Sequence, residues 1–124
     1  MKGYSKRFDF VRERAAKINM VKVIDRVAEL LGISYNDVVG NSRKREVSDA
    51  RKISVKIVID IMNFDNKSYF KYGHTLLGIL LNKAHPDVIY NYRKCEDLIS
   101  SSKDFREKYN KCLFLQQEFI DLIK

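Results

Sequence analysis

Two groups of polar residues in this sequence have types and a spacing that suit contact with an anion. The first is a run of three cations, Arg43-Lys44-Arg45. The second begins at His85-Pro86-Asp87, the expected start of a helix whose polar side carries further hydrogen-bonding groups, Asn91, Arg93 and Lys94. No nucleophile stands with a base and an orienting group, so the sequence predicts a protein that is not an enzyme.

The second group lies in a pattern that is typical of a helix-turn-helix. A short apolar helix, predicted over residues 74–81, breaks at Leu81-Asn82-Lys83, and a helix predicted over residues 86–99 follows after a tight turn. In a helix-turn-helix the first turn of the second helix enters the DNA major groove. Contacts in this segment are therefore predicted for Lys83, His85, Asp87, Asn91, Arg93 and Lys94.

The net charge favours an anionic partner. The chain carries 24 Lys and Arg against 16 Asp and Glu, a formal net charge of +8, which favours nucleic acid or an acidic membrane surface. Residues 1–26 hold eight cations and three acids, and residues 43–56 hold six cations and two acids, whereas residues 95–124 are nearly balanced. The positive charge is therefore concentrated in two segments and is not a general solubilising coat.

Size and cysteine content point to one ordinary domain. A chain of 124 residues with 45% hydrophobic residues can form a single compact core. Cys95 and Cys112 lie among apolar neighbours and have no histidine at zinc-ligand spacing, so buried free thiols and no metal or other cofactor are expected. No run approaches the roughly 18 apolar residues of a membrane span, and no apolar signal-peptide core opens the chain. A cytoplasmic protein without a membrane partner is predicted.

Helical periodicity dominates the chain and predicts an all-α helical bundle. Three segments are expected: a basic N-terminal helix in residues 1–19, a helix-turn-helix domain over residues 20–100, and a C-terminal helix over residues 101–124. The final helix is expected to begin at Ser101 or Ser102. Its apolar side chains leave two alternatives open, packing on the domain or forming a homodimer surface.

Several residues predict where the helices begin and end. Gly32 is expected to end the helix that starts near Met20, and Ser34 to cap a short helix closed by Gly40. Ser48 is expected to cap a long helix that reaches about residue 62; its β-branched runs favour a strand by propensity, but its cap and length favour a helix. Residues 63–72 read as a loop whose aromatic side chains either stack on bases or cover the core: Tyr69, Phe70 and Tyr72.

From Ile24 to about Leu98 the sequence resembles the C-terminal DNA-binding domain of the bacterial replication initiator DnaA. In that family a helix with A-D-L-L precedes a basic loop and a helix that starts V-A-R-P-R-Q; here residues 36–39 (N-D-V-V) precede the basic run and residues 47–52 (V-S-D-A-R-K). The family signature G-G-R-D-H-T-T-V matches residues 81–88, and C-R-K-I matches residues 92–95, with the spacing kept. The resemblance implies the Trp-repressor-like fold of that domain.

The resemblance also implies roles for individual residues. Arg43 matches the family arginine that enters the minor groove, where a guanidinium suits the narrow, electronegative space. Arg51 matches an arginine that meets DNA, and Lys52 replaces the glutamine beside it; both are expected to hold phosphates. The remaining DNA contacts that follow from the match are Lys44, Arg45, Lys83 and His85. Lys83 replaces the signature arginine, and His85 is retained.

The sequence departs from the family at the tip of the recognition helix. The signature aspartate is Ala84, and the two threonines are Pro86 and Asp87, so the family's DNA sequence preference does not carry over. Asp87 suits a helix N-terminus through its charge, or accepts a hydrogen bond from cytosine in the groove. No glycine-rich phosphate loop of the P-loop kind is present, so ATP hydrolysis is not expected.

These features together predict double-stranded DNA binding by a helix-turn-helix, as a regulator of replication or transcription. The expected location is the cytoplasm of a bacterial or phage-infected cell, in association with the nucleoid. An alternative stays open, because a basic loop is often merely solvated. The fold would then serve as a non-enzymatic protein-interaction scaffold that has lost DNA readout.

Overall fold

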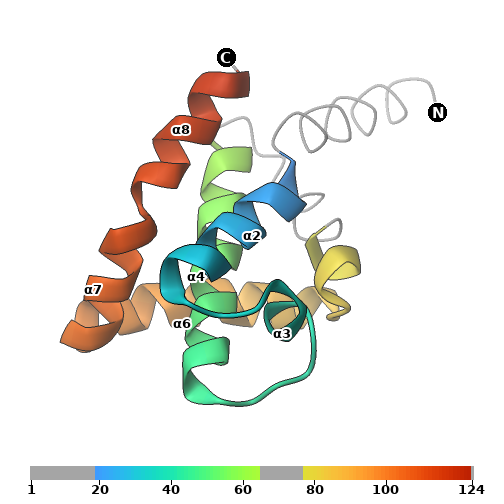
Figure 1. Ribbon diagram of the computed structural model, residues 1–124, viewed down its shortest axis with the longest axis vertical. Coiled ribbons are helices and arrows are strands. Elements are labelled where there is room, and N and C mark those ends of the chain that lie inside the picture. Colours follow the sequence, from blue (N-terminus) through green and yellow to red (C-terminus); the bar gives the residue numbers. More distant parts are fainter. Residues whose placement is uncertain (1–18, 65–76, 124) are drawn as a thin grey trace.

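The computed structural model describes residues 19–64 and 77–123, and it is all-α there, which confirms the predicted fold class (Figure 1). Residues 1–18 of the predicted basic N-terminal helix and residues 65–72 of the predicted aromatic loop, which include Tyr69, Phe70 and Tyr72, lie outside the described residues. No helix in the described part of the chain is long and apolar enough to cross a membrane. In chain order the helices are α2 (Met20–Leu31), α3 (Tyr35–Val38), α4 (Arg45–Met62), a short helix at residues 77–81, α6 (His85–Ser101), α7 (Lys103–Cys112) and α8 (Phe114–Ile123).

The long helix α4 is the centre of the fold. It contacts α2, α3, α6, α7 and α8, and Figure 1 shows it upright in the middle of the bundle with α6 crossing it. A helix whose sides are nearly all buried packs inside a domain, and from Ile53 to Met62 only Lys56 and Asp60 of α4 are partly exposed. The β-branched runs therefore belong to a helix, as predicted, and their fully buried side chains are Ile53, Val55, Ile57, Val58, Ile59 and Ile61.

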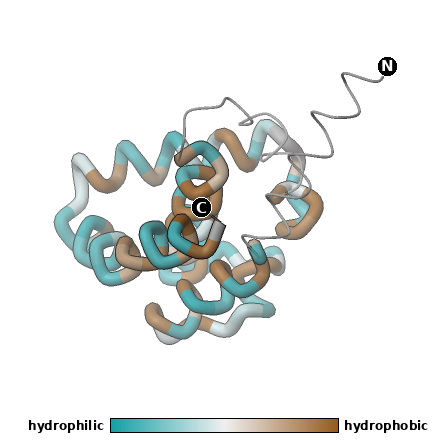
Figure 2. Tube along the Cα trace, turned by 90° about the horizontal axis from the view of Figure 1, so that it is seen from above, coloured by the Kyte–Doolittle hydropathy of each residue, from teal (hydrophilic) through white to brown (hydrophobic). Residues whose placement is uncertain are grey.

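The surrounding helices are amphipathic, and Figure 2 shows hydrophobic and hydrophilic residues alternating along each of them. Their apolar sides meet α4 in one continuous core. Residues from α7 and α8 belong to this same core as residues from α2, so the C-terminal segment packs on the rest of the domain. The core side chains that α7 and α8 contribute are Phe105, Tyr109, Cys112, Leu115, Phe119 and Ile120.

Two of the predicted helix ends are confirmed. Gly32 ends α2 in the left-handed conformation, with φ 71°, and the Ile33 N–H donates to Ala28 O at 2.8 Å. Ser102 caps α7, because its Oγ accepts from the Phe105 N–H at 3.3 Å.

Other predicted boundaries are wrong. Helix α4 begins at Arg45 and not after Ser48, because Val47 is already buried in the core and Glu46 is favoured in a first helical turn. For α3 the predicted N-cap, Ser34, is confirmed, although its side chain makes no capping hydrogen bond, but the helix ends at Val38 with Val39, and not Gly40, as its C-cap. The single predicted C-terminal helix is two helices, separated at Leu113.

Candidate nucleic-acid interface

A tight turn joins the helix at residues 77–81 to α6. The Lys83 N–H donates to Gly78 O at 2.8 Å, and a Cβ on Gly78 would lie only 2.8 Å from Lys83 O, so the turn requires glycine there. Asn82 has a φ of 54°, in the left-handed region that glycine and asparagine tolerate best. This explains why an asparagine fits where the initiator signature has a glycine.

The first turn of α6 presents polar and apolar groups to solvent. Ala84 is the N-cap, and Pro86 lies in the first turn, where its missing N–H is not needed. Val88 points into the core and fixes the rotation of the helix. As a result Pro86, Asp87 and Tyr90 are exposed. The Asn91 side chain donates to Asp87 O at 3.0 Å and lies beside them.

The basic loop, residues 41–44, meets the start of α6 at a recess of about 720 Å³. We call this the basic recess. Its lining includes six of the predicted site residues: Arg43, Arg51, Lys52, Lys83, Asp87 and Asn91. The other lining residues are Asn41, Ser42, Ser48 and Tyr90. Lys83 Nζ lies 3.4 Å from Asn41 Oδ1, which links the turn to the loop.

The basic recess carries positive charge that no ion pair with another described residue cancels. Four cations and one acid line it, and the ion pairs between described residues use other cations, Arg26, Lys56 and Lys108. Lys52 is half-buried and donates to Ser48 Oγ at 2.6 Å; burial lowers its pKa, and the nearby Asp49 opposes that shift only in part. Cations and amides converging on one hollow can bind an anionic group such as phosphate.

Arg51 lies in surroundings that do not favour the predicted phosphate contact. Its side chain is buried, and its Nε and Nη2 donate to backbone carbonyls of α3 and of the loop that follows. Burial lowers the pKa of the guanidinium from a very high value, so the group stays charged. Arg51 is therefore an internal brace of the loop, at the edge of the recess.

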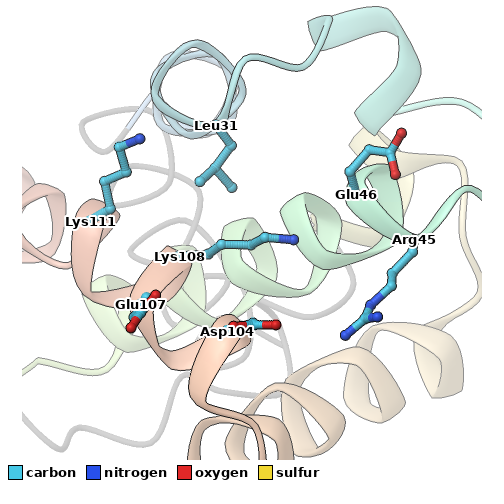
Figure 3. A pocket seen from close by; sticks show the side chains of 7 residues that line it. All are labelled: Leu31, Arg45, Glu46, Asp104, Glu107, Lys108 and Lys111. Atoms are coloured by element: carbon cyan, nitrogen blue, oxygen red, sulfur yellow. The ribbon is translucent and has the colours of Figure 1, made fainter.

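The basic run itself divides between two faces. Lys44 is exposed at the N-cap of α4, and Arg43 faces the basic recess. Arg45 instead lines a second pocket between α2, α4 and α7 (Figure 3). That pocket has mixed charge, because its other lining residues are Leu31, Glu46, Asp104, Glu107, Lys108 and Lys111. Arg45 thus belongs to a different surface from Arg43.

Arg93 and Lys94 lie farther along α6, in a shallow pocket beside the recess. They line it with Pro86, Ile89, Asp97 and Tyr90, and Tyr90 lines the basic recess as well. Tyr90 was not among the predicted contacts; its side chain is 60% exposed and lines both hollows. Helical spacing could have found it, because position 90 falls one turn after Pro86 on the polar side of the helix.

Both cysteines are buried free thiols, as predicted. Burial raises the pKa of Cys95 to about 12 and of Cys112 to about 11. Within residues 19–64 and 77–123, no group of three or more His, Cys, Asp and Glu side chains is placed to hold a metal ion.

Comparison with known proteins gives partial similarity to one kind of protein, the chromosomal replication initiator DnaA. The chain is 32% identical to DnaA of a Synechococcus species over 89 residues, 72% of this chain and 18% of that protein. It is 26% identical to DnaA of Tropheryma whipplei over 86% of this chain and 21% of that protein. It is also 26% identical to DnaA of Pseudothermotoga lettingae, over 64% of this chain and 16% of that protein.

The chain resembles the C-terminal region of DnaA. It spans about a fifth or less of the length of these relatives, and the similarity does not cover their ATPase domain. No family model matches the sequence. No solved structure matches it either.

Proposed function

We propose that this chain binds double-stranded DNA through the helix-turn-helix formed by residues 77–81 and α6, as a regulator of replication or transcription. One observation carries the proposal: the loop, the turn and the first turns of α6 line the basic recess on one face. The cations of this recess form no ion pair with a described acidic residue. Uncompensated cations beside a helix start suit a phosphate backbone. The similarity to the DnaA C-terminal region supports the same function.

In the proposed complex the first turn of α6 enters the major groove. Pro86, Asp87 and Tyr90 are the exposed side chains there, and they would face base edges and thymine methyl groups. Arg43 would reach the adjacent minor groove. Phosphates would be held by the cations around this face: Lys44, Lys52, Lys83, Arg93 and Lys94.

The tip of α6 would set the sequence preference. Asp87 accepts hydrogen bonds and cannot donate them when it is ionised, so it favours the exposed amino groups of cytosine or adenine. Lys83 keeps the charge of the arginine in the initiator signature but lacks its bidentate fork. We therefore expect a preferred site that differs from that of the initiator where these residues dock.

The test is fluorescence anisotropy with a duplex carrying the initiator's recognition site and a scrambled duplex, across a salt series. Binding that weakens steeply with salt supports the proposal, because binding releases counterions from the phosphates and added salt reduces the free energy gained by that release. A preference for the initiator site would mean that Pro86 and Asp87 still permit its readout. Equal affinity for both duplexes would point to another preferred site. No binding to either duplex at low salt would refute the function.

A second candidate follows from apolar side chains that α8 leaves in solvent. Phe114 is 50% exposed and Leu122 is 66% exposed, although the Arg26 guanidinium lies over the Phe114 ring at 5.9 Å. These side chains would form a homodimer surface or the contact of an interaction scaffold. Sedimentation equilibrium of wild type and Leu122→Lys separates the cases: a dimer that dissociates in the variant supports this second role, and a monomer throughout excludes self-association.

A further inference from the structure

Arg51 makes an unusual set of contacts for a charged residue. Its Nε donates to Val38 O at 2.8 Å, and its Nη2 lies 3.1–3.2 Å from three more carbonyl oxygens, those of Asp37, Gly40 and Ser42. The side chain is only 8% exposed. No carboxylate takes part in these contacts, so the guanidinium is held by neutral backbone alone.

Three of the bonded carbonyls, those of Val38, Gly40 and Ser42, accept no backbone hydrogen bond within the described part of the chain, whereas Asp37 O also accepts from the Gly40 N–H at 3.2 Å. Helix α3 has four residues, so the carbonyls at its end have no helical N–H to accept from. The stretch that follows, residues 39–44, connects α3 to α4 outside any helix. A guanidinium is the side chain with enough donors, in a fixed fork, to bridge several such carbonyls at once.

The braced segment leads directly to Arg43. Ser42 O is the last carbonyl that Arg51 holds, and the next residue is the one proposed to enter the minor groove. Arg51 itself stands on α4, which is anchored in the core through its buried apolar side chains. Arg51 thus ties the segment that leads to Arg43 to α4, in addition to the contact between Lys83 and Asn41.

We propose that Arg51 is a positioning residue for DNA binding: it fixes residues 37–42 so that Arg43 meets the minor groove, and it does not itself contact DNA. The inference rests on the proposed function for its consequence, but the brace exists in the free protein. It predicts that charge alone at position 51 is insufficient, because a lysine cannot bridge the four carbonyls.

The first test needs no DNA. Amide hydrogen exchange is measured at Val39, Gly40 and Lys44, whose N–H groups donate within this segment. In Arg51→Lys these amides should exchange about tenfold faster, while the core amides of α4 keep their protection. Lys52→Gln is the matched control at the next position and should leave the three amides unchanged. Unchanged exchange in Arg51→Lys would overturn the brace.

The second test is a double-mutant cycle in DNA affinity, measured with the duplex that wild type binds most tightly. Arg51→Lys should weaken binding about tenfold, and most of that loss should vanish in an Arg43→Ala background, because both changes remove the same contact. The parallel cycle with Arg93→Ala should be additive. If Arg51→Lys adds its full effect to Arg43→Ala, then Arg51 contacts DNA directly and the proposal is wrong.

The two tests separate the inference from the function it serves. A wild-type protein that binds no duplex refutes the proposed function, and the exchange experiment still decides whether Arg51 braces the loop. Arg51→Gln serves as a second variant if Arg51→Lys retains partial bridging. Far-UV circular dichroism of each variant establishes that the helices are intact before either result is interpreted.

Discussion

Two regions along α4 differ in how their charged side chains are paired. Near its C-terminal end Lys56 pairs with Asp60 at 2.9 Å, and Tyr92 of α6 donates to the other Asp60 oxygen at 2.6 Å. The Lys56 ammonium also lies over the Tyr92 ring at 4.7 Å, with Glu96 3.8 Å away. Here each charge meets an opposite charge or a hydrogen bond, and the network joins α4 to α6.

Near its N-terminal end the same helix borders the basic recess, where cations have hydrogen bonds to hydroxyls and carbonyls and no described ion pair. Cations left unpaired at a surface contribute little to folding and repel one another. Asp49 in the N-terminal half also has an ion pair, with Lys108 at 3.0 Å, but neither residue lines the recess. The contrast is therefore between the paired charges around Lys56 and the cations of the basic recess, which have no ion pair with another described residue and suit the proposed binding of an anion.

The largest loss of stability is expected from Ile57→Ala, in the C-terminal half of α4. Ile57 has no exposed surface, and truncating such a side chain removes apolar contacts and leaves a cavity. The free energy of unfolding should fall by about 3 kcal/mol, measured by urea denaturation. DNA affinity of the folded fraction should stay at the wild-type value. A loss of stability below 1 kcal/mol would contradict the central position of this residue.

The basic loop beside the recess is tested by charge reversal, Arg43→Glu with Lys44→Glu. Duplex affinity should fall about 100-fold, since two contacts with polyanionic DNA become repulsive. The unfolding free energy should change by no more than about 0.5 kcal/mol, because both side chains are exposed and unpaired among the described residues.

The matched control for this reversal is Lys103→Glu with Lys111→Glu on α7. These two residues are also exposed, so the net charge changes by the same amount on a different face. Affinity should then fall far less. Equal losses in the two variants would mean that binding follows net charge and not the basic recess.

The contribution of the network between α4 and α6 to stability is tested by Tyr92→Phe. The change removes the hydrogen bond to Asp60 and keeps the ring under Lys56, so the loss should be about 1–2 kcal/mol of unfolding free energy. Burial, followed by the hydrogen bond to Asp60, raises the pKa of Tyr92 far above its usual range, so the hydroxyl stays protonated. A chemical denaturation series at neutral pH measures the effect, and DNA affinity should not respond.

The smallest effect at neutral pH is expected for the thiols. Burial raises the pKa of Cys95 to about 12 and of Cys112 to about 11, from 9.0 for a free thiol, so the folded protein holds these protons longer than the unfolded chain does. Their contribution is fully present below about pH 9 and is lost as the pH rises toward the folded values. Denaturation midpoints between pH 7 and pH 10.5 should therefore decline.

The control for the thiol effect is a protein with both cysteines changed to alanine. The denaturation midpoint of this variant should decline less with pH than that of wild type, because the thiol contribution is gone. Some decline should remain, since the tyrosines and lysines titrate in both proteins. Ellman's reagent should leave native wild type unmodified at pH 8 and react after unfolding. Rapid reaction of the native protein would show that the thiols are not enclosed.

Much of the fold was predictable from local pattern. Helical periodicity, Gly32 and Ser102 determined the class, the end of α2 and the start of α7, because caps and amphipathic spacing act within a few residues. The start of α4 was not predictable, since a serine at position 48 is an adequate cap in isolation. Burial of Val47 in the core decided for an earlier start. Tertiary packing outweighs one capping hydrogen bond.

The candidate site shows the same division. The sequence by itself determined its chemistry: a basic loop, a break at Leu81-Asn82-Lys83, and a polar helix start at residues 85–87. Only the tertiary structure decided how these residues act. It brings the loop against α6, separates Arg45 from Arg43, exposes Tyr90, and turns Arg51 inward to hold the loop. Residue type limits what a side chain can bind, but burial and neighbouring backbone decide what it does bind, and those depend on contacts between distant segments.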